Sequence, residues 1–254
     1  MTADDPRTCS VEFRVRFDEA GPDGLLRTSS LLRYAQDLAS VHSAERGFDR
    51  AWYAERGLAW LARAASAAIL APVAHGSSMT GTTRVLGERR VWARRRTEFH
   101  DPDGRLLAWS HVDWVLLDER GAPTRIPPEF QPAFGTGKAT LLLGRVELEP
   151  PPAGAHTVQL VVRPQELDPM NHVNNAVYAD WLDEAILAAG GEREVRHVPR
   201  LVRLEFARSA EPAAALTATA WPDEGDGWSY RLADRTGAEL LRARLEPAGE
   251  GSPH

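Results

Sequence analysis

Residues 167–185, LDPMNHVNNAVYADWLDEA, place an acid, a histidine and three asparagines directly before an apolar stretch. The carboxylate of Asp168 can act as a general base on water or, as a nucleophile, attack a carbonyl carbon. His172 can orient that water, hold the carbonyl oxygen or donate to Asp168. A helix that begins at about Val173 to Ala176 would present free backbone N–H groups to a developing oxyanion. The pattern therefore allows hydrolytic chemistry at a carbonyl group.

The same residues also have a structural interpretation. Asp168 can form an Asx turn whose carboxylate only ties the loop together, and His172 can satisfy a buried loop. Either Asn174 or Asn175 is a good N-cap, because its side-chain oxygen accepts a free N–H of the first turn. The alternative for both asparagines is to hold the substrate. Glu184, about two turns beyond the cap, is either a reserve base or a solvated acid.

Composition and charge limit the class of protein. The chain has 254 residues, 43% of them hydrophobic, which is enough for one large domain or two ordinary ones. A formal net charge of −6 argues against general nucleic-acid binding, which needs a basic surface. Neither a leader with an apolar core nor a run of roughly 18 apolar residues stands out, so we expect a cytoplasmic protein without a membrane span.

Metal and cofactor chemistry is not expected. Cys9 is the single cysteine, which excludes an internal disulfide and a cysteine-rich metal site. Neither a glycine-rich phosphate loop nor a histidine pair at metal-ligand spacing stands out, so we expect no cofactor and no metal. The chemistry is then expected to come from side chains and backbone alone.

The chain divides near its middle. Residues 126–156, IPPEFQPAFGTGKATLLLGRVELEPPPAGAH, carry prolines and glycines on both sides of a short apolar run. This is typical of an inter-domain connection with a strand inside it. The predicted domains are therefore 1–125 and 157–248, with the polar turn in the second and a tail at 249–254.

The two halves repeat one order of elements. At an offset of 147 residues (171 minus 24), the first turn and helix align without a gap with the second; further along, WLARAASAAI from Trp60 aligns with RLVRLEFARS from Arg200 at an offset of 140 (200 minus 60). Chance similarity of amphipathic segments is one explanation, and an ancient duplication is the one we favour. The aligned pairs are Gly24 with Asn171, Tyr34 with Trp181 and Asp37 with Glu184.

Helical and strand patterns predict an α+β protein. TSSLLRYAQDLASVHSAERG has apolar residues at helical spacing and ends at Gly47, and the helix after the polar turn ends at Gly190. RRVWARRRTEFHDPDGRLLAWSHVDWVLLDERG and WSYRLADRTGAELLRARLEP each read as two strands joined by a turn. We expect two antiparallel sheets, each wrapped around its own long central helix.

Two such units, with an HVNN turn before the second helix, resemble the double hotdog fold of the acyl-ACP thioesterases of plants and bacteria. The resemblance runs through most of the chain, including FRVRFDEAGPDGLLRTSSLLRYAQDLASVHS, GLAWLARAASAAI and WVLLDERGAPTRIPPEF. It implies hydrolysis of a fatty or polyketide-like thioester carried on acyl carrier protein or on CoA. It also allows a homodimer of double hotdogs.

The family's site residues carry over in part. The plant enzymes have an aspartate, an asparagine and a histidine at alternate positions of the turn, which fall here on Asp168, Met170 and His172. Asn171 either substitutes for the missing asparagine or replaces a glycine common in the wider superfamily. The plant enzymes also have an acid and a cysteine where this chain has Ser209 and Ala210. These departures keep two alternatives open: a non-catalytic acyl-binding protein, and an acyltransferase that uses an alcohol or an amine.

The first half lacks the acid–histidine pair, since Gly21 aligns with Asp168 and Leu25 with His172. We therefore expect one active site per chain, and an acyl pocket formed by the first half. The basic segment GERRVWARRRTEF is either a solvated outer sheet face or, through Arg94 and Arg96, a docking surface for the acidic carrier protein.

Overall fold

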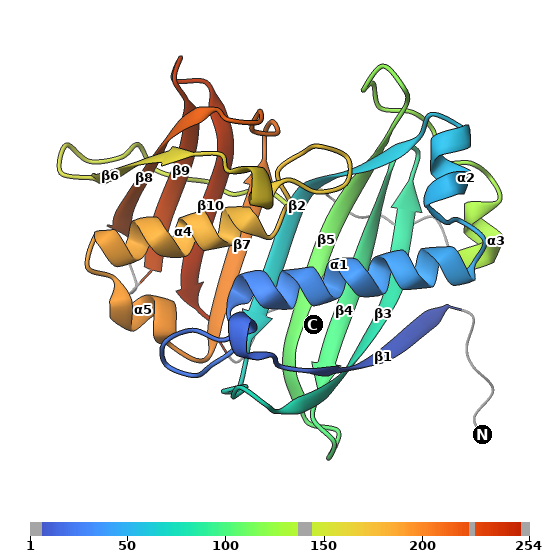
Figure 1. Ribbon diagram of the computed structural model, residues 1–254, viewed down its shortest axis with the longest axis horizontal. Helices are drawn as coiled ribbons and strands as arrows, with labels where there is room; N and C mark the ends of the chain where they lie inside the picture. Colours follow the sequence, from blue (N-terminus) through green and yellow to red (C-terminus); the bar gives the residue numbers. More distant parts are fainter. Residues whose placement is uncertain (1–6, 137–143, 224–226, 250–254) are drawn as a thin grey trace.

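The computed structural model describes residues 7–136, 144–223 and 227–249 (Figure 1). The first half contains β1 (Thr8–Arg14), the 3-10 turn η1 (Phe17–Glu19), α1 (Thr28–Glu45), α2 (Arg50–Glu55), β2 (Ala59–Ile69), β3 (Ser78–Arg89), β4 (Trp92–His100), β5 (Leu106–Leu117) and α3 (Phe130–Phe134). The second contains β6 (His156–Val161), η2 (Pro164–Glu166), α4 (Val177–Ala188), α5 (Glu192–Arg196), β7 (Arg200–Phe206), β8 (Ala215–Asp223), β9 (Gly227–Asp234) and β10 (Glu239–Pro247).

The strands form one sheet rather than two. Its order is β1-β3-β4-β5-β2-β7-β10-β9-β8-β6, all antiparallel, so the second half repeats the first in reverse across the β2–β7 junction. The pairing runs from Ala64 opposite Glu205 to Ile69 opposite Arg200. The two predicted sheets are therefore the two halves of one continuous sheet, joined by the pairing of β2 with β7. The physical reason is that β2 and β7 would otherwise be edges with unpaired backbone groups, and pairing satisfies both.

The two long helices lie on one face of the sheet, α1 over the first five strands and α4 over the second five (Figure 1). The buried face of α1 includes Leu31, Tyr34 and Leu38, and that of α4 includes Val177 and Trp181, as the helical spacing predicts. Both faces belong to one apolar core with the inner faces of the strands. No helix in the described ranges is long and apolar enough to cross a membrane.

The hydrogen bonds repeat at the predicted offset of 147 residues. Glu19 caps the backbone N–H of Arg16 and accepts from Tyr34, while Glu166 caps Arg163 and accepts from Trp181. Gly24 and Asn171 both have a left-handed backbone, with φ of 74° and 62°. These repeated contacts support the duplication at the level of single atoms.

The connection is described in part. It contains the short helix α3, which the sequence pattern did not predict. The apolar run at 139–143, where a strand is predicted, lies outside the described residues, as does most of the predicted tail. The boundaries at 125 and 157 stay predictions.

Candidate active site

The polar turn before α4 is held by the carboxylate of Asp168. Its Oδ1 accepts from the backbone N–H of Met170 at 2.8 Å and of His172 at 3.1 Å. The Asp168 N–H donates to the His172 carbonyl at 2.7 Å, which closes the turn. Asn171 occupies the left-handed position, where asparagine is one of the few tolerated non-glycine residues. This left-handed backbone is the conformation that a glycine adopts readily, which supports the interpretation that Asn171 replaces a glycine.

Three hairpin turns have the same construction. Asp101, Asp118 and Asp234 each accept at Oδ1 from the backbone N–H groups two and four residues on, and a glycine follows each at the left-handed position. The Asx-turn interpretation of Asp168 is thus correct as far as Oδ1 is concerned. Its Oδ2 forms no hydrogen bond with a described residue, and Asp168 lines two cavities. One carboxylate can therefore hold the turn with one oxygen and act on a ligand with the other.

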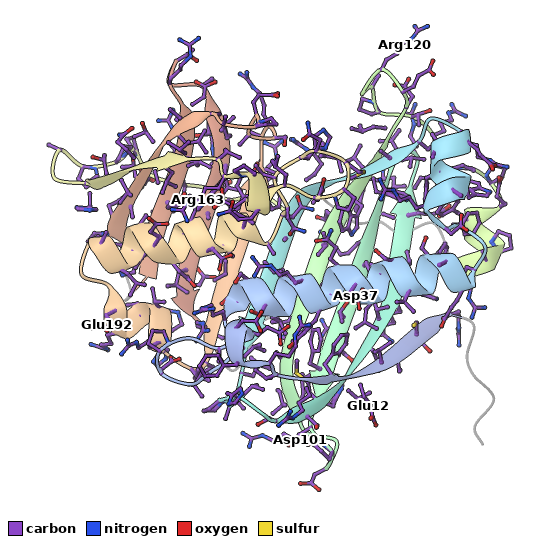
Figure 2. All side chains as sticks on the ribbon, viewed as in Figure 1. Glu12, Asp37, Asp101, Arg120, Arg163 and Glu192 are labelled. Atoms are coloured by element: carbon purple, nitrogen blue, oxygen red, sulfur yellow. The ribbon has the colours of Figure 1, made fainter. Side chains whose placement is uncertain are left out.

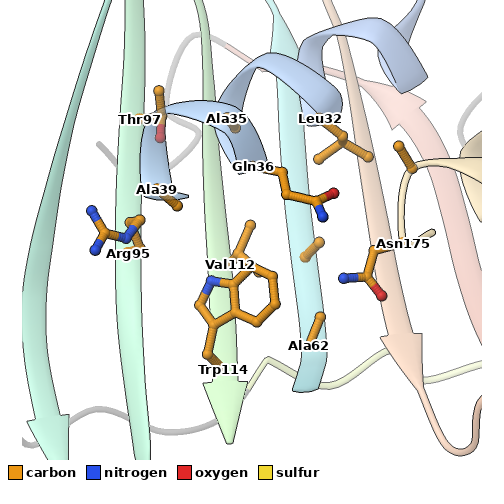
Figure 3. Close-up of a pocket in the computed structure, with 12 residues that line it drawn as sticks. Leu32, Ala35, Gln36, Ala39, Ala62, Arg95, Thr97, Val112, Trp114 and Asn175 are labelled. Atoms are coloured by element: carbon orange, nitrogen blue, oxygen red, sulfur yellow. The ribbon is translucent and has the colours of Figure 1, made fainter. Parts of the chain in front are cut away.

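The entry to α4 separates the roles of the two asparagines. Asn174 Oδ1 accepts the N–H of Ala176, the N-cap residue of α4, at 2.9 Å, so Asn174 holds the turn that leads into the helix. Asn175 instead lines the space beside α1, as Figure 3 shows. The backbone N–H groups of Val173 and Asn175 donate to no acceptor in the described ranges. They lie just before the N-terminus of α4, a helix of 12 residues, and are available donors for an oxyanion near its positive end.

We expect Asn174→Ala to lower the free energy of unfolding by about 1 kcal/mol, because it removes the acceptor for the Ala176 N–H. Asn175→Ala should change stability much less and alter turnover instead. Urea unfolding of both variants, with steady-state kinetics, compares the two effects. A larger stability loss in Asn175→Ala would show that Asn175, and not Asn174, stabilises the entry to α4.

The turn faces a pocket built by both halves, which we call the turn pocket. Asp168, His172, Val173, Asn175 and Ser209 line it from the second half. Gln36, Trp60 and Trp114 line it from α1, β2 and β5 of the first half. Met170 and Arg208 also line it, together with Arg63, which sits at a bulge in the β2–β5 register. Asp168 and His172 are thus brought to one pocket, although His172 is largely exposed.

Gln36 is a residue that local pattern did not single out. It lies on the cavity side of α1, with Trp114 below it and Asn175 beside it (Figure 3). Its equivalent in the second half, at the offset of 147, is Asp183. Asp183 lies near Arg200, which bonds to the segment before α1, just as Gln36 lies near the segment before α4. Alignment of the two halves could therefore have identified Gln36 as a residue of the site.

A large cavity of about 470 Å³ adjoins the turn pocket. Asp168 and Met170 line both the turn pocket and the large cavity. A narrow space along α1, drawn in Figure 3, adjoins the two, and Gln36 and Trp114 line all three. The large cavity lies in the first half, as expected for the acyl pocket. Six aromatic side chains line it, those of Phe48, Tyr53, Trp60, Trp114, Phe130 and Phe134, and its charged lining residues include Asp49, Arg50, Glu88 and Arg95.

In the first half, the place that corresponds to the turn pocket is occupied by the side chain of Arg200. Arg200, which aligns with Trp60, donates to the Thr28 hydroxyl at 3.4 Å and to the Leu26 carbonyl at 3.3 Å. Leu26 and Thr28 align with Val173 and Asn175, so the guanidinium occupies the place that corresponds to the turn pocket. Burial raises the pKa of nearby Asp183 to about 7, while Arg200 opposes the rise. This arrangement supports one active site per chain.

The remaining predicted residues lie elsewhere. Glu184 is exposed on α4, lines none of the three cavities, and lies nine residues, or about 13 Å along the helix, beyond Asn175. Arg94 forms two hydrogen bonds with buried Asp113, at 2.6 and 2.8 Å, and Arg96 is buried and bonded to Glu98. The expectation of Arg94 and Arg96 as an exposed docking pair is therefore wrong, because carboxylates of the sheet already hold both.

Both halves of the chain match models of known protein families. Residues 6–134 match the acyl-ACP thioesterase N-terminal domain and residues 151–246 match the acyl-ACP thioesterase C-terminal domain. No curated protein sequence matches the chain.

Solved structures share the fold. A Lactobacillus plantarum protein described as an oleoyl thioesterase is 20% identical with a TM-score of 0.85, covering 94% of this chain and 93% of its own. The 12:0-ACP thioesterase of Umbellularia californica is 22% identical with a TM-score of 0.81, covering 94% and 96%. An acyl-ACP thioesterase of Bacteroides thetaiotaomicron is 13% identical with a TM-score of 0.78, covering 94% and 97%. The predicted double hotdog is confirmed, and the chain belongs to the acyl-ACP thioesterase family.

Proposed function

We propose that this chain hydrolyses acyl-ACP thioesters in the turn pocket, with the acyl chain in the large cavity. One observation carries the proposal: Val173 and Asn175, whose backbone N–H groups have no acceptor in the described ranges, line the same pocket as Asp168. An oxyanion donor and a general base are the two components that thioester hydrolysis requires.

The reaction follows from the positions of these groups. The thioester carbonyl oxygen accepts from the N–H groups of Val173 and Asn175, which polarises the carbonyl carbon. Asp168 Oδ2 takes a proton from water, and the oxygen of that water bonds to the carbonyl carbon. The tetrahedral intermediate then collapses, the carbon–sulfur bond breaks, and the thiolate takes the proton from Asp168. Gln36 and His172 are positioned to orient the water, since both line the pocket.

Incubation of the purified protein with a panel of acyl-ACPs and acyl-CoAs tests the proposal. Hydrolysis requires release of free thiol and of free acid in equal amounts. Binding of acyl-ACP without thiol release would favour the non-catalytic acyl-binding protein. Thiol release that depends on an added alcohol or amine, with an ester or amide as product, would favour the acyltransferase. A homodimer stays a separate prediction.

We also propose that the carrier approaches over Arg63 and Arg208, in place of Arg94 and Arg96. Arg63 and Arg208 line the turn pocket, and Arg208 is exposed on the chain after β7. We expect Arg208→Glu to raise KM for acyl-ACP about tenfold at low salt, with a smaller change for an acyl-pantetheine, because a rim charge acts mainly on encounter with the acidic carrier. Equal changes in KM for both substrates would contradict this docking role.

A further inference from the structure

Three consecutive arginines of β4 have different surroundings. Arg94 and Arg96 lie on the outer face of the sheet and pair with Asp113 and Glu98. Arg95 lies on the opposite face and lines both the large cavity and the narrow space beside α1. Figure 3 shows its guanidinium on the cavity side of β4. Because side chains alternate between the two faces of a strand, Arg95 points to the cavity side while its two neighbours point outward.

No carboxylate of the described residues forms an ion pair with Arg95. Its Nη1 donates to Nδ1 of buried His42 at 2.9 Å and reaches the Thr83 hydroxyl at 3.5 Å. The guanidinium also lies 5.7 Å from the ring centre of Phe134. Since a guanidinium only donates, His42 accepts at Nδ1 and brings no compensating negative charge.

This arrangement is costly without a ligand. Burial lowers the pKa of Arg95 to about 10, so the side chain is still charged at neutral pH. A buried charge is normally paired with an opposite charge, because its hydration is lost and must be replaced. A buried neutral hydroxyl needs only neutral hydrogen-bond partners, and the Tyr53 hydroxyl has them in Ser43 and Trp60. Asp49 and Glu88 line the same cavity, but neither forms an ion pair with Arg95, so the guanidinium has no anion within ion-pair distance among the described residues.

The guanidinium lies at a distance from the reacting carbonyl. Figure 3 places Asn175 and Arg95 on opposite sides of the narrow space, with Gln36 and Trp114 between them. Gln36 and His42, the partner of Arg95, are six residues apart on α1, which is about 9 Å along the axis. A group bound to Arg95 would therefore belong to the remote part of the acyl chain, not to the thioester.

We propose that the preferred substrate is an acyl chain with a carboxylate remote from the thioester, and that this carboxylate binds Arg95 inside the large cavity. The inference rests on the proposed thioesterase function and adds its substrate class. A plain alkyl chain would leave the cation without a counter-charge, while a carboxylate would accept from the planar guanidinium in a two-bond geometry. The aromatic walls would hold the methylenes between the two polar ends.

Matched pairs of substrates test this proposal. Each pair consists of an alkyl acyl-ACP and its counterpart with a terminal carboxylate: hexanoyl with adipoyl, octanoyl with suberoyl, and decanoyl with sebacoyl. For at least one pair, wild-type protein should have the higher kcat/KM for the carboxylated member. In Arg95→Met the ratio of the two kcat/KM values should fall about 100-fold, as expected for loss of a charge-assisted hydrogen-bonded pair. Arg95→Lys should retain part of the ratio.

Arg84→Met is the control variant, because Arg84 is an exposed arginine on neighbouring strand β3 and lines none of the three cavities. Its substrate ratio should equal that of the wild type. A wild type that prefers the alkyl member of every pair, or an unchanged ratio in Arg95→Met, would overturn the inference and leave the thioesterase function standing.

A binding measurement separates this inference from the proposed function. Calorimetry with free suberate and octanoate does not require turnover. Tighter binding of suberate by the wild type, lost in Arg95→Met, would support the carboxylate site even if no thioester is hydrolysed. Equal binding of the two acids by both proteins would count against the site. Thermal unfolding of each variant checks that the fold is retained.

Discussion

Asp168→Asn is expected to leave the fold intact and to lower kcat by about 10²–10⁴-fold. The asparagine side-chain oxygen can still accept from the N–H groups of Met170 and His172, so the turn keeps the two contacts that now involve Oδ1. What disappears is the second carboxylate oxygen, which is the base toward water. Measurement of kcat with the best acyl-ACP, together with a thermal unfolding curve, reports both effects.

The chain contains its own controls for this substitution. Asp101→Asn and Asp234→Asn change the same turn construction at positions that line none of the three cavities. Asp101 lies in the β4–β5 hairpin at the lower edge of the molecule, away from α4 (Figure 2). If either control lowers kcat as much as Asp168→Asn does, the loss is a turn effect and Asp168 is not the base.

A comparison with Glu184→Gln then tests the reserve base. Glu184 is exposed and lies outside the cavities, so its amide variant should retain near wild-type kcat. Full activity in Asp168→Asn with loss of activity in Glu184→Gln would move the base to the helix. Full activity in both would require another base in the turn pocket.

Local signals accounted for most of the fold. The helix periods and the Asp-containing turns depend on neighbours in sequence, and the Gly24–Asn171 equivalence depends on aligning the two halves; all three are found in the structure. Asp168 and His172 could be found for the same reason, since turn and helix start lie in one segment. The roles of Asn174 and Asn175 could not be separated, because either can cap, and the choice depends on where α4 begins.

The continuous sheet, Gln36 and Arg95 depend on contacts between distant segments. Pairing of β2 with β7 cannot be inferred from either strand alone, because both have the residues of ordinary buried strands. For Arg95 a signal was present: Phe99, four residues along β4, has the same alternation and lies in the core. The density of arginines in the segment concealed this, because a run of basic residues usually indicates a solvated face.

Arg94→Glu is expected to lower the free energy of unfolding by about 3 kcal/mol rather than to act on carrier docking, because it breaks a largely buried ion pair. The Arg94 side chain is 20% exposed and that of Asp113 only 3%, and the two residues are direct cross-strand partners. The glutamate would face the Asp113 carboxylate, which also accepts from the Gly144 N–H at 2.8 Å. Urea unfolding measures the loss.

The control for Arg94→Glu is Arg84→Glu, which reverses an exposed charge on the neighbouring strand and should change stability little. Arg94→Asp combined with Asp113→Arg restores opposite charges across the strands and should recover part of the stability, which a simple surface role would not predict. If Arg94→Glu instead unfolds at the wild-type urea concentration and raises KM for acyl-ACP alone, the ion pair contributes nothing to the fold and the original docking role of Arg94 is correct.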